Sequence, residues 1–158
     1  ELWTTPSKLG GGELRGEAKY RRLVSLCRSY GCLTPEDAYP VWNGAGGPCR
    51  IAPLFVLYDY SFRPDEVPLE GAIAWAEEAN IVCTDEFMLR PEPHPSIPAW
   101  CAARHEETLA RLERESDLPL VLVNHFALHE SLIRFEHIPR FSLWCGTRKT
   151  ADWHTRSR

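Results

Sequence analysis

The segment Leu120–Phe126 carries the residue that is best placed to do chemistry. It reads Leu-Val-Leu-Val-Asn-His-Phe, an apolar run that ends in Asn124 and His125. Such a run favours a buried strand, and a strand that ends in a histidine holds the imidazole rigidly. A neutral imidazole binds transition metals, and it also acts as a general base near neutral pH. We therefore predict a buried strand over residues 120–123 with a metal or catalytic site at its C-terminal end.

Other residues leave further interpretations open. His129 lies four positions after His125, so on a continuous helix the two histidines could bind one metal ion. The residues between them, however, lack the glutamate of a His-Glu-x-x-His helix. Cys145 could act as a nucleophile with His125 as its base, and a buried structural thiol is the competing interpretation. The sequence contains no Gly-x-Ser-x-Gly elbow and no glycine-rich phosphate loop. A purely structural His125 also remains compatible with the sequence.

Composition and charge are those of an ordinary globular domain. The 158 residues are 44% hydrophobic and 25% charged, which suits one domain. The net charge of −4 argues against a nucleic-acid binder, which would need a basic face. No apolar run approaches the roughly 20 residues of a membrane span, and the N-terminus does not resemble a signal peptide. We therefore predict a cytoplasmic protein with no nucleic-acid or membrane partner.

The cysteines and the first residue bear on the cellular context. The cysteines are Cys27, Cys32, Cys49, Cys83, Cys101 and Cys145. Because they do not form Cys-x-x-Cys pairs, we expect reduced, buried thiols rather than disulfides or a zinc site. The chain begins at Glu1 and its single methionine is Met88. We interpret it as an internal piece of a longer protein.

Hydrophobic periodicity predicts helices around a small number of strands. The predicted helices span residues 16–30, 69–79, 99–116, 128–135 and 149–158. Gly31 follows the first helix as its terminating glycine, and Thr150 is the predicted N-cap of the last one. Because strands and helices alternate along the chain, the order indicates a layered α/β protein.

A β-hairpin is predicted before the strand that carries the histidine. Residues 39–42 and 50–58 flank the turn-rich stretch 43–48, a pattern typical of two antiparallel strands. The second strand is almost continuously apolar, which predicts a cover on both of its faces. It ends in Asp59 and Tyr60, a polar and aromatic pair of the kind that faces a site.

Residues 82–98 are predicted to form a lid or a wall that faces substrate. The stretch is rich in proline and carries the acidic pair Asp85 and Glu86, and long structured loops of this kind are often functional. We interpret the two acids as solvated or lid residues, since neighbours in an extended loop point apart. The aromatic residues Tyr58 and Phe62, together with Tyr60, are further candidates for substrate contacts.

Several segments resemble the calcineurin-like metallophosphoesterase family. The similar segments are residues 1–4, 58–62, 84–87, 121–126, 141–147 and 152–154. The resemblance covers essentially the whole chain and points to an actinobacterial 4′-phosphopantetheinyl hydrolase-like subgroup. It implies an α/β fold that is part of a four-layer αββα sandwich. Residues 1–158 would then be a single partial domain with its N- and C-terminal parts missing.

The resemblance also implies a metal site and its ligands. Family members hold two divalent metal ions of the Mn, Fe or Zn type, and of their ligand motifs only the later single histidine matches this chain, at His125. Asn124, Asp59 and Tyr60 are candidates for supporting that ligand or facing the substrate, and no catalytic residue is assigned. Ala127 stands where the family form has proline, which implies a less rigid loop.

The function implied is metal-dependent hydrolysis of phosphate esters, since two metal ions activate a bridging water and clamp the phosphate oxygens. The expected partner is a phosphorylated small molecule or a phosphopantetheinyl group. The chain by itself is expected to be inactive, because most of the metal-binding motifs would lie outside it. The alternative, from another functional class, is a non-catalytic interaction domain derived from the same fold.

Overall fold

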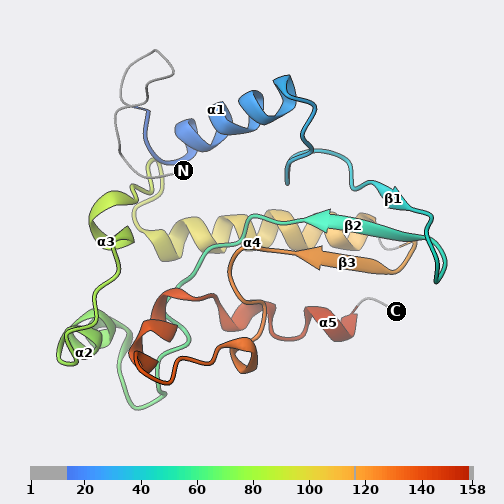
Figure 1. The fold of residues 1–158 in the computed structure, drawn as a ribbon. Helices are drawn as coiled ribbons and strands as arrows, with labels where there is room; N and C mark the ends of the chain where they lie inside the picture. The colour runs from blue at the N-terminus through green and yellow to red at the C-terminus, as the bar shows by residue number, and fades with distance from the viewer. Residues whose placement is uncertain (1–13, 116, 157–158) are drawn as a thin grey trace.

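The structure is a computed structural model that describes residues 14–115 and 117–156. Residues 1–4, which contribute to the resemblance described above, lie outside these ranges. The elements in chain order are α1 (Gly16–Ser29), β1 (Val41–Trp42), β2 (Cys49–Pro53), η1 (Leu69–Gly71), α2 (Ala72–Glu77), α3 (Asp85–Met88), α4 (Ile97–Arg114), β3 (Leu120–Val123), η2 (Glu130–Leu132), η3 (Pro139–Trp144), η4 (Arg148–Thr150) and α5 (Trp153–Arg156). Figure 1 shows β1, β2 and β3 in front of α4, with the segment from η2 to α5 along one edge of the sheet.

The described strands form a mixed sheet in the order β1-β2-β3. The predicted hairpin is confirmed, because β1 and β2 pair antiparallel with Val41 opposite Arg50. β2 and β3 pair parallel, with Ile51 opposite Val121. A parallel pair needs a long crossover, and α4 lies within the crossover of this pair. The sheet therefore combines one hairpin with one helical crossover.

β2 is shorter than predicted and ends at Pro53 rather than at residue 58. Proline has no N–H to donate to a strand ladder, so it interrupts regular pairing. The N–H of Leu54 still donates to the Val123 carbonyl at 2.8 Å. Beyond this bond, residues 55–58 continue as a non-strand segment in which Val56 is buried.

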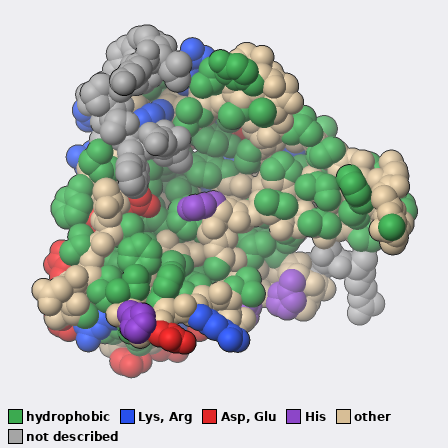
Figure 2. Space-filling model, in the orientation of Figure 1, with side chains coloured by type: hydrophobic (Ala, Val, Ile, Leu, Met, Phe, Trp, Pro, Cys, Tyr) green, Lys and Arg blue, Asp and Glu red, His purple; other side chains and the backbone are tan. Residues whose placement is uncertain are grey.

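β3 forms at the predicted residues, but it is not the buried strand that its composition indicates. Val121 and Val123 are 45% and 52% exposed, whereas Leu120 and Leu122 on the other face are half-buried. Alternate residues of a strand point to opposite faces, and only one of these faces is covered by the described residues. Figure 2 shows hydrophobic side chains gathered over the strands on the uncovered side.

Two helices, α1 and α4, agree closely with the sequence predictions. α1 is followed by Gly31 at φ 72°, the left-handed conformation of a helix-terminating glycine. α4 begins at Ile97, before the predicted residue 99, because the Ser96 side chain accepts from the Ala99 N–H at 3.2 Å. Proline is tolerated in a first helical turn, so Pro98 does not oppose this start.

The remaining predicted helices are shorter than expected. The prediction over residues 69–79 corresponds to η1 and α2, and the prediction over 128–135 is reduced to η2. The stretch 82–98, which was predicted to be a long loop, contains the short helix α3. Within the described part of the chain, no helix is long and apolar enough to span a bilayer.

The last predicted helix is also corrected. It is divided into η4 and α5, and its predicted end at residues 157–158 lies outside the described ranges. Thr147, not Thr150, caps η4, because its Oγ1 accepts from the Lys149 N–H at 3.2 Å. Thr150 is buried instead, and its Oγ1 donates to the Leu128 carbonyl at 2.7 Å.

The core forms where α4 packs against the segment after β2. Its largest fully buried side chains include Val56, Leu57, Tyr58, Trp100, Cys101 and Leu143. The segment after β2 is thus covered on both sides, as its apolar run predicts, although most of it is not strand. Its burial holds the C-terminal end of the sheet in place.

Candidate functional site

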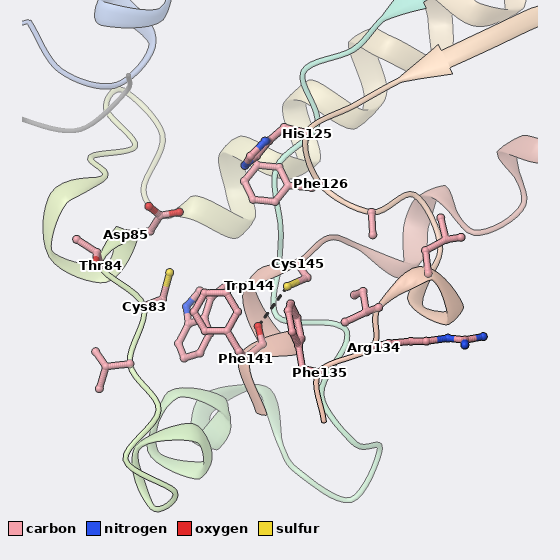
Figure 3. A pocket seen from close by; sticks show the side chains of 14 residues that line it. Cys83, Thr84, Asp85, His125, Phe126, Arg134, Phe135, Phe141, Trp144 and Cys145 are labelled. Atoms are coloured by element: carbon pink, nitrogen blue, oxygen red, sulfur yellow. Dashed lines mark hydrogen bonds between the residues drawn. The ribbon is translucent and has the colours of Figure 1, made fainter. Parts of the chain in front are cut away.

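An open cleft of about 660 Å³ lies beyond the C-terminal end of β3. The lining residues fall within three stretches of the chain, 82–85, 125–135 and 141–145, and they include Cys83, Asp85, His125, Phe126, Trp144 and Cys145. Figure 3 shows the side chains of His125 and Asp85 on different sides of this hollow, with the aromatic rings between and below them. The volume falls within the range of small-molecule sites.

His125, the predicted metal ligand, lies exposed on this cleft. Its ring meets the Phe126 ring edge-on, with 4.9 Å between centroids. Within residues 14–115 and 117–156, no group of three or more His, Cys, Asp or Glu residues is arranged to hold a metal ion. The metal role of His125 therefore stays a prediction, and the structure supplies its place at the strand end and on a cleft.

Asn124 fastens the loop that carries the histidine. Its Oδ1 accepts from the Val56 N–H at 3.2 Å, and its Nδ2 donates to the Val56 carbonyl at 3.0 Å. The same Nδ2 donates to the Phe126 carbonyl at 3.0 Å. The side chain thereby sets the path of the backbone on both sides of His125, which fits the predicted supporting role.

A backbone contact fastens the loop on its other side. Ala127 donates its N–H to the Cys145 carbonyl at 2.8 Å and forms a parallel bridge with Gly146. A proline at position 127 could not donate this bond. Alanine at this position therefore permits a hydrogen bond to the segment that carries Trp144.

Asp59, a candidate for substrate contact, is buried and does not line the cleft. Its Oδ2 accepts from Thr147 Oγ1 at 2.8 Å and lies 3.6 Å from Lys149 Nζ. Its Oδ1 accepts from the Ser61 N–H at 3.2 Å. These contacts join the segment after β2 to the start of η4. The structure therefore shows Asp59 as a buried contact between these two segments.

Tyr60 and Glu86 form a hydrogen-bonded unit with Trp144. Glu86 Oε1 accepts from the Tyr60 hydroxyl at 2.8 Å and from Trp144 Nε1 at 2.6 Å. Burial raises the pKa of Tyr60, as does this hydrogen bond, so the hydroxyl stays protonated as a donor. Glu86, which the sequence indicates as a solvated or lid residue, is half-buried and hydrogen-bonded within this unit. Asp85 lines the cleft, and the role of residues 82–98 as a lid or wall stays a prediction.

The predicted aromatic contacts are replaced by others. Tyr58 is 0% exposed, and neither Tyr58 nor Phe62 is among the residues that line the cleft. Burial raises the pKa of Tyr58, and its hydroxyl has no hydrogen-bond partner in the described structure. The aromatic lining comes from Phe126, Phe141 and Trp144 instead. These three residues lie in segments that resemble the calcineurin-like family, and that resemblance was the signal in the sequence that could have identified them.

The cysteines that line the cleft are protonated thiols. Burial raises the pKa values of Cys83 and Cys145 to about 11, and the thiolate is the nucleophilic form. The Cys145 thiol donates to the Phe141 carbonyl at 3.3 Å. These facts argue against a Cys145 nucleophile. The prediction of free thiols agrees with the structure, whereas Cys27 and Cys32 are exposed rather than buried.

No family model matches the chain. It is 49% identical over 158 residues to the acyl-carrier-protein phosphodiesterase PptH of Mycobacterium tuberculosis, across 99% of this chain and 48% of that protein. It also superposes on the crystal structure of phosphopantetheinyl hydrolase (PptH) from Mycobacterium tuberculosis with a TM-score of 0.90 and 48% identity, covering 99% of this chain and 56% of that one. The chain thus spans about half the length of the proteins it matches. Over that span it is a close homologue of a phosphopantetheinyl hydrolase.

Proposed function

We propose that this chain is part of a metal-dependent phosphodiesterase that removes phosphopantetheinyl groups from acyl carrier protein. One observation carries the proposal: the chain that presents His125 on an open cleft is 49% identical, along its whole matched length, to an acyl-carrier-protein phosphodiesterase. The cleft lies at the C-terminal end of a parallel strand, the usual place for a site in a layered α/β fold.

His125 is the residue that we assign to a divalent metal ion of the Mn, Fe or Zn type. An imidazole suits these ions, and this one is exposed on the cleft while Asn124 and Ala127 fasten its loop. Since the described residues hold no group of three potential ligands, we assign the remaining ligands to positions outside them. Bound ions of this class activate water and neutralise charge on phosphoryl oxygens.

The residues of this chain would contribute position and shape. Asn124 holds the His125 loop against the segment after β2. The aromatic rings of the cleft keep water from one side of a bound ester, which strengthens electrostatic interactions within the site. The thiols beside them stay protonated at neutral pH, so they do not compete with water as nucleophiles.

The uncovered face of the sheet supports a four-layer αββα sandwich for the complete fold. Trp42 is 59% exposed on β1, and Val121 and Val123 are exposed on β3. A continuous apolar sheet face of this kind normally packs against another layer. We therefore propose that a second sheet covers it in the full-length protein.

The test uses the full-length protein and acyl carrier protein that carries phosphopantetheine. We expect loss of the group, measured as a decrease in the mass of the carrier protein. A chelator should abolish this loss, and Mn²⁺, Fe²⁺ or Zn²⁺ should restore it. His125→Ala should reduce the rate by at least about 100-fold, since even the partners of metal ligands cost 10–100-fold. His137→Ala, an exposed loop histidine, is the matched control.

Two outcomes would contradict the proposal. Turnover that a chelator leaves unchanged would show a different chemistry. Binding of the carrier protein without any product, whichever ion is supplied, would favour the alternative of a non-catalytic interaction domain.

A further inference from the structure

The aromatic residues beside His125 define a second part of the cleft, whose role goes beyond holding a phosphate. It is lined by the half-buried Phe126 and Phe141 and by the buried Trp144, and we refer to these three side chains as the aromatic wall. We propose that the aromatic wall binds the apolar part of a pantetheine arm and that Glu86 holds Trp144 in position for this contact. This inference rests on the proposed function.

The aromatic wall is contiguous with the predicted metal ligand. The His125 and Phe126 rings lie 4.9 Å apart between centroids, and the Phe141 and Trp144 rings lie 5.5 Å apart at an angle of 47°. Figure 3 shows Phe126 on the His125 side of the hollow, with Trp144 and Phe141 across from it. A ligand whose phosphate lies at His125 therefore meets aromatic surface immediately beside it.

A pantetheine arm has the chemistry that this arrangement fits. Next to its phosphate end it carries a carbon with two methyl groups, and two amides and a thiol follow. The methyl groups match the aromatic surface next to His125, because apolar contact with aromatic rings is favourable. Thr84 and Asp85 offer polar groups on the same cleft to the amides. The volume of about 660 Å³ accommodates a ligand of this size.

The state of the nearby thiols also fits a ligand that ends in a thiol. Cys83 and Cys145 both line the cleft, and burial raises the pKa of each to about 11. The thiolate is the charged form of a cysteine side chain. At neutral pH these side chains therefore lie beside the arm as uncharged, weakly polar surface.

Glu86 acts through Trp144, because it does not itself line the cleft. Its Oε1 accepts from the Trp144 indole at 2.6 Å and from the Tyr60 hydroxyl at 2.8 Å. Hydrogen bonds to an ionised acceptor are short and strong. Loss of the carboxylate would leave the N–H of the buried Trp144 indole and the hydroxyl of the half-buried Tyr60 unpaired, which favours a different indole orientation. Glu86 is thus a positioning residue for the aromatic wall.

The experiment compares two substrates of the full-length protein. The first is acyl carrier protein with its phosphopantetheine arm, and the second is methyl 4-nitrophenyl phosphate, a diester without the arm. Trp144→Leu should raise KM for the carrier protein by about 3- to 10-fold, the effect of losing one aromatic contact. Its kcat/KM for the small diester, which has no arm to contact the wall, should fall less than its kcat/KM for the carrier protein.

Two further variants separate position from folding. Glu86→Ala should reproduce the KM effect of Trp144→Leu, and Glu86→Gln should recover most of the affinity, because its amide oxygen still accepts from the indole. Trp75→Leu is the matched control, since Trp75 is a half-buried tryptophan that packs on Arg140 and does not line the cleft. It should leave both KM values unchanged.

Binding of free pantetheine, measured by calorimetry, gives a readout that does not depend on turnover. Weaker binding to Trp144→Leu, with unchanged binding to Trp75→Leu, supports the inference. Equal losses on both diesters, or unchanged binding of pantetheine, would overturn it. If the full-length protein hydrolyses neither diester, the proposed function fails, and the calorimetric comparison still decides whether the aromatic wall binds the arm.

Discussion

The side chain of Asn124 forms hydrogen bonds with the backbone of Val56, as the backbone of a neighbouring strand would. The amide of Asn124 accepts from the N–H of Val56 and donates to its carbonyl, at 3.2 and 3.0 Å. This pair of bonds lies beyond Pro53 and Val123, where the β2–β3 pairing ends. One asparagine side chain thus continues the contact between the two segments for a further step and places the residue that follows it, His125, at the cleft.

Asn124→Ala is expected to destabilise the protein. It leaves the buried Val56 N–H and C=O without their partner, and unpaired buried groups cost about 1–3 kcal/mol each. We expect a loss of about 2–4 kcal/mol in the free energy of unfolding, measured by urea denaturation of the full-length protein. Asn43→Ala, at an exposed loop position, is the control and should change stability by less than about 0.5 kcal/mol. A loss no greater than the control's would show that Asn124 does not carry this contact.

Gly146→Ala tests the close approach of the two segments that form the cleft. A Cβ at position 146 would lie 2.3 Å from the Ala127 carbonyl oxygen and 2.8 Å from Phe62 Cε2. We expect a loss of about 2–3 kcal/mol, as for an overpacked core, with a lower melting temperature in calorimetry. Gly71→Ala is the matched control, because its Cβ would meet nothing closer than Pro68 Cγ at 3.5 Å. Equal melting temperatures for the two variants would contradict this prediction.

Glu36 should make stability depend on acid pH. Its carboxylate accepts from the Tyr20 hydroxyl and from Arg104, each at 2.7 Å. Burial acts to raise the pKa of Glu36, but the Tyr20 hydrogen bond and the Arg104 charge outweigh it, and the net pKa is lowered. The resulting stability is therefore present above the unfolded pKa of about 4.3 and is lost as the pH falls through the lower folded value.

Glu36→Gln is the variant that measures this effect. It should lose about 2 kcal/mol at pH 7, the contribution of hydrogen bonds to a charged group. Its difference from the wild type should shrink as the pH falls below about 4. Urea unfolding at several pH values checks both expectations, with the exposed Glu66→Gln as control. A difference that stays constant down to pH 3 would contradict the assignment.

Alkylation should distinguish the exposed from the buried thiols. Cys27 and Cys32 are exposed, whereas Cys83 and Cys145 combine partial or full burial with pKa values of about 11. With iodoacetamide at pH 7.5, the exposed pair should react at least about 10-fold faster. The reason is that the thiolate is the nucleophilic form and that the reagent must also be able to reach it. Peptide mass spectrometry over time measures the rates. Rapid modification of Cys145 would restore the thiol-enzyme hypothesis.

Local pattern accounts for much of the fold. The helix over residues 16–29 and its terminating Gly31 follow from apolar spacing and from the left-handed freedom of glycine, both of which are properties of neighbouring residues. The hairpin and β3 were predictable for the same reason. The location of His125 at the strand end was predictable too, since it needs only the end of an apolar run.

Where the sequence prediction was wrong, a distant partner or a competing local bond decided the outcome. Thr147 rather than Thr150 caps η4, because the Thr150 hydroxyl is drawn to the Leu128 carbonyl. The composition of β3 predicts a buried strand, but one of its faces is exposed. Burial depends on the layers that cover a strand, and the residues of the strand do not determine those layers.

By itself, the sequence determined the strand that delivers His125, the hairpin beside it and the resemblance on which the predicted metal role of the histidine rests. Only the tertiary structure showed that Glu86 holds Trp144 and Tyr60, partners that lie 58 and 26 residues away. It also showed that Tyr58, a predicted substrate contact, is buried away from the cleft, whereas Trp144 lines it. The physical reason is that period and propensity act between near neighbours, whereas a cleft is made by side chains that meet only after the chain has packed.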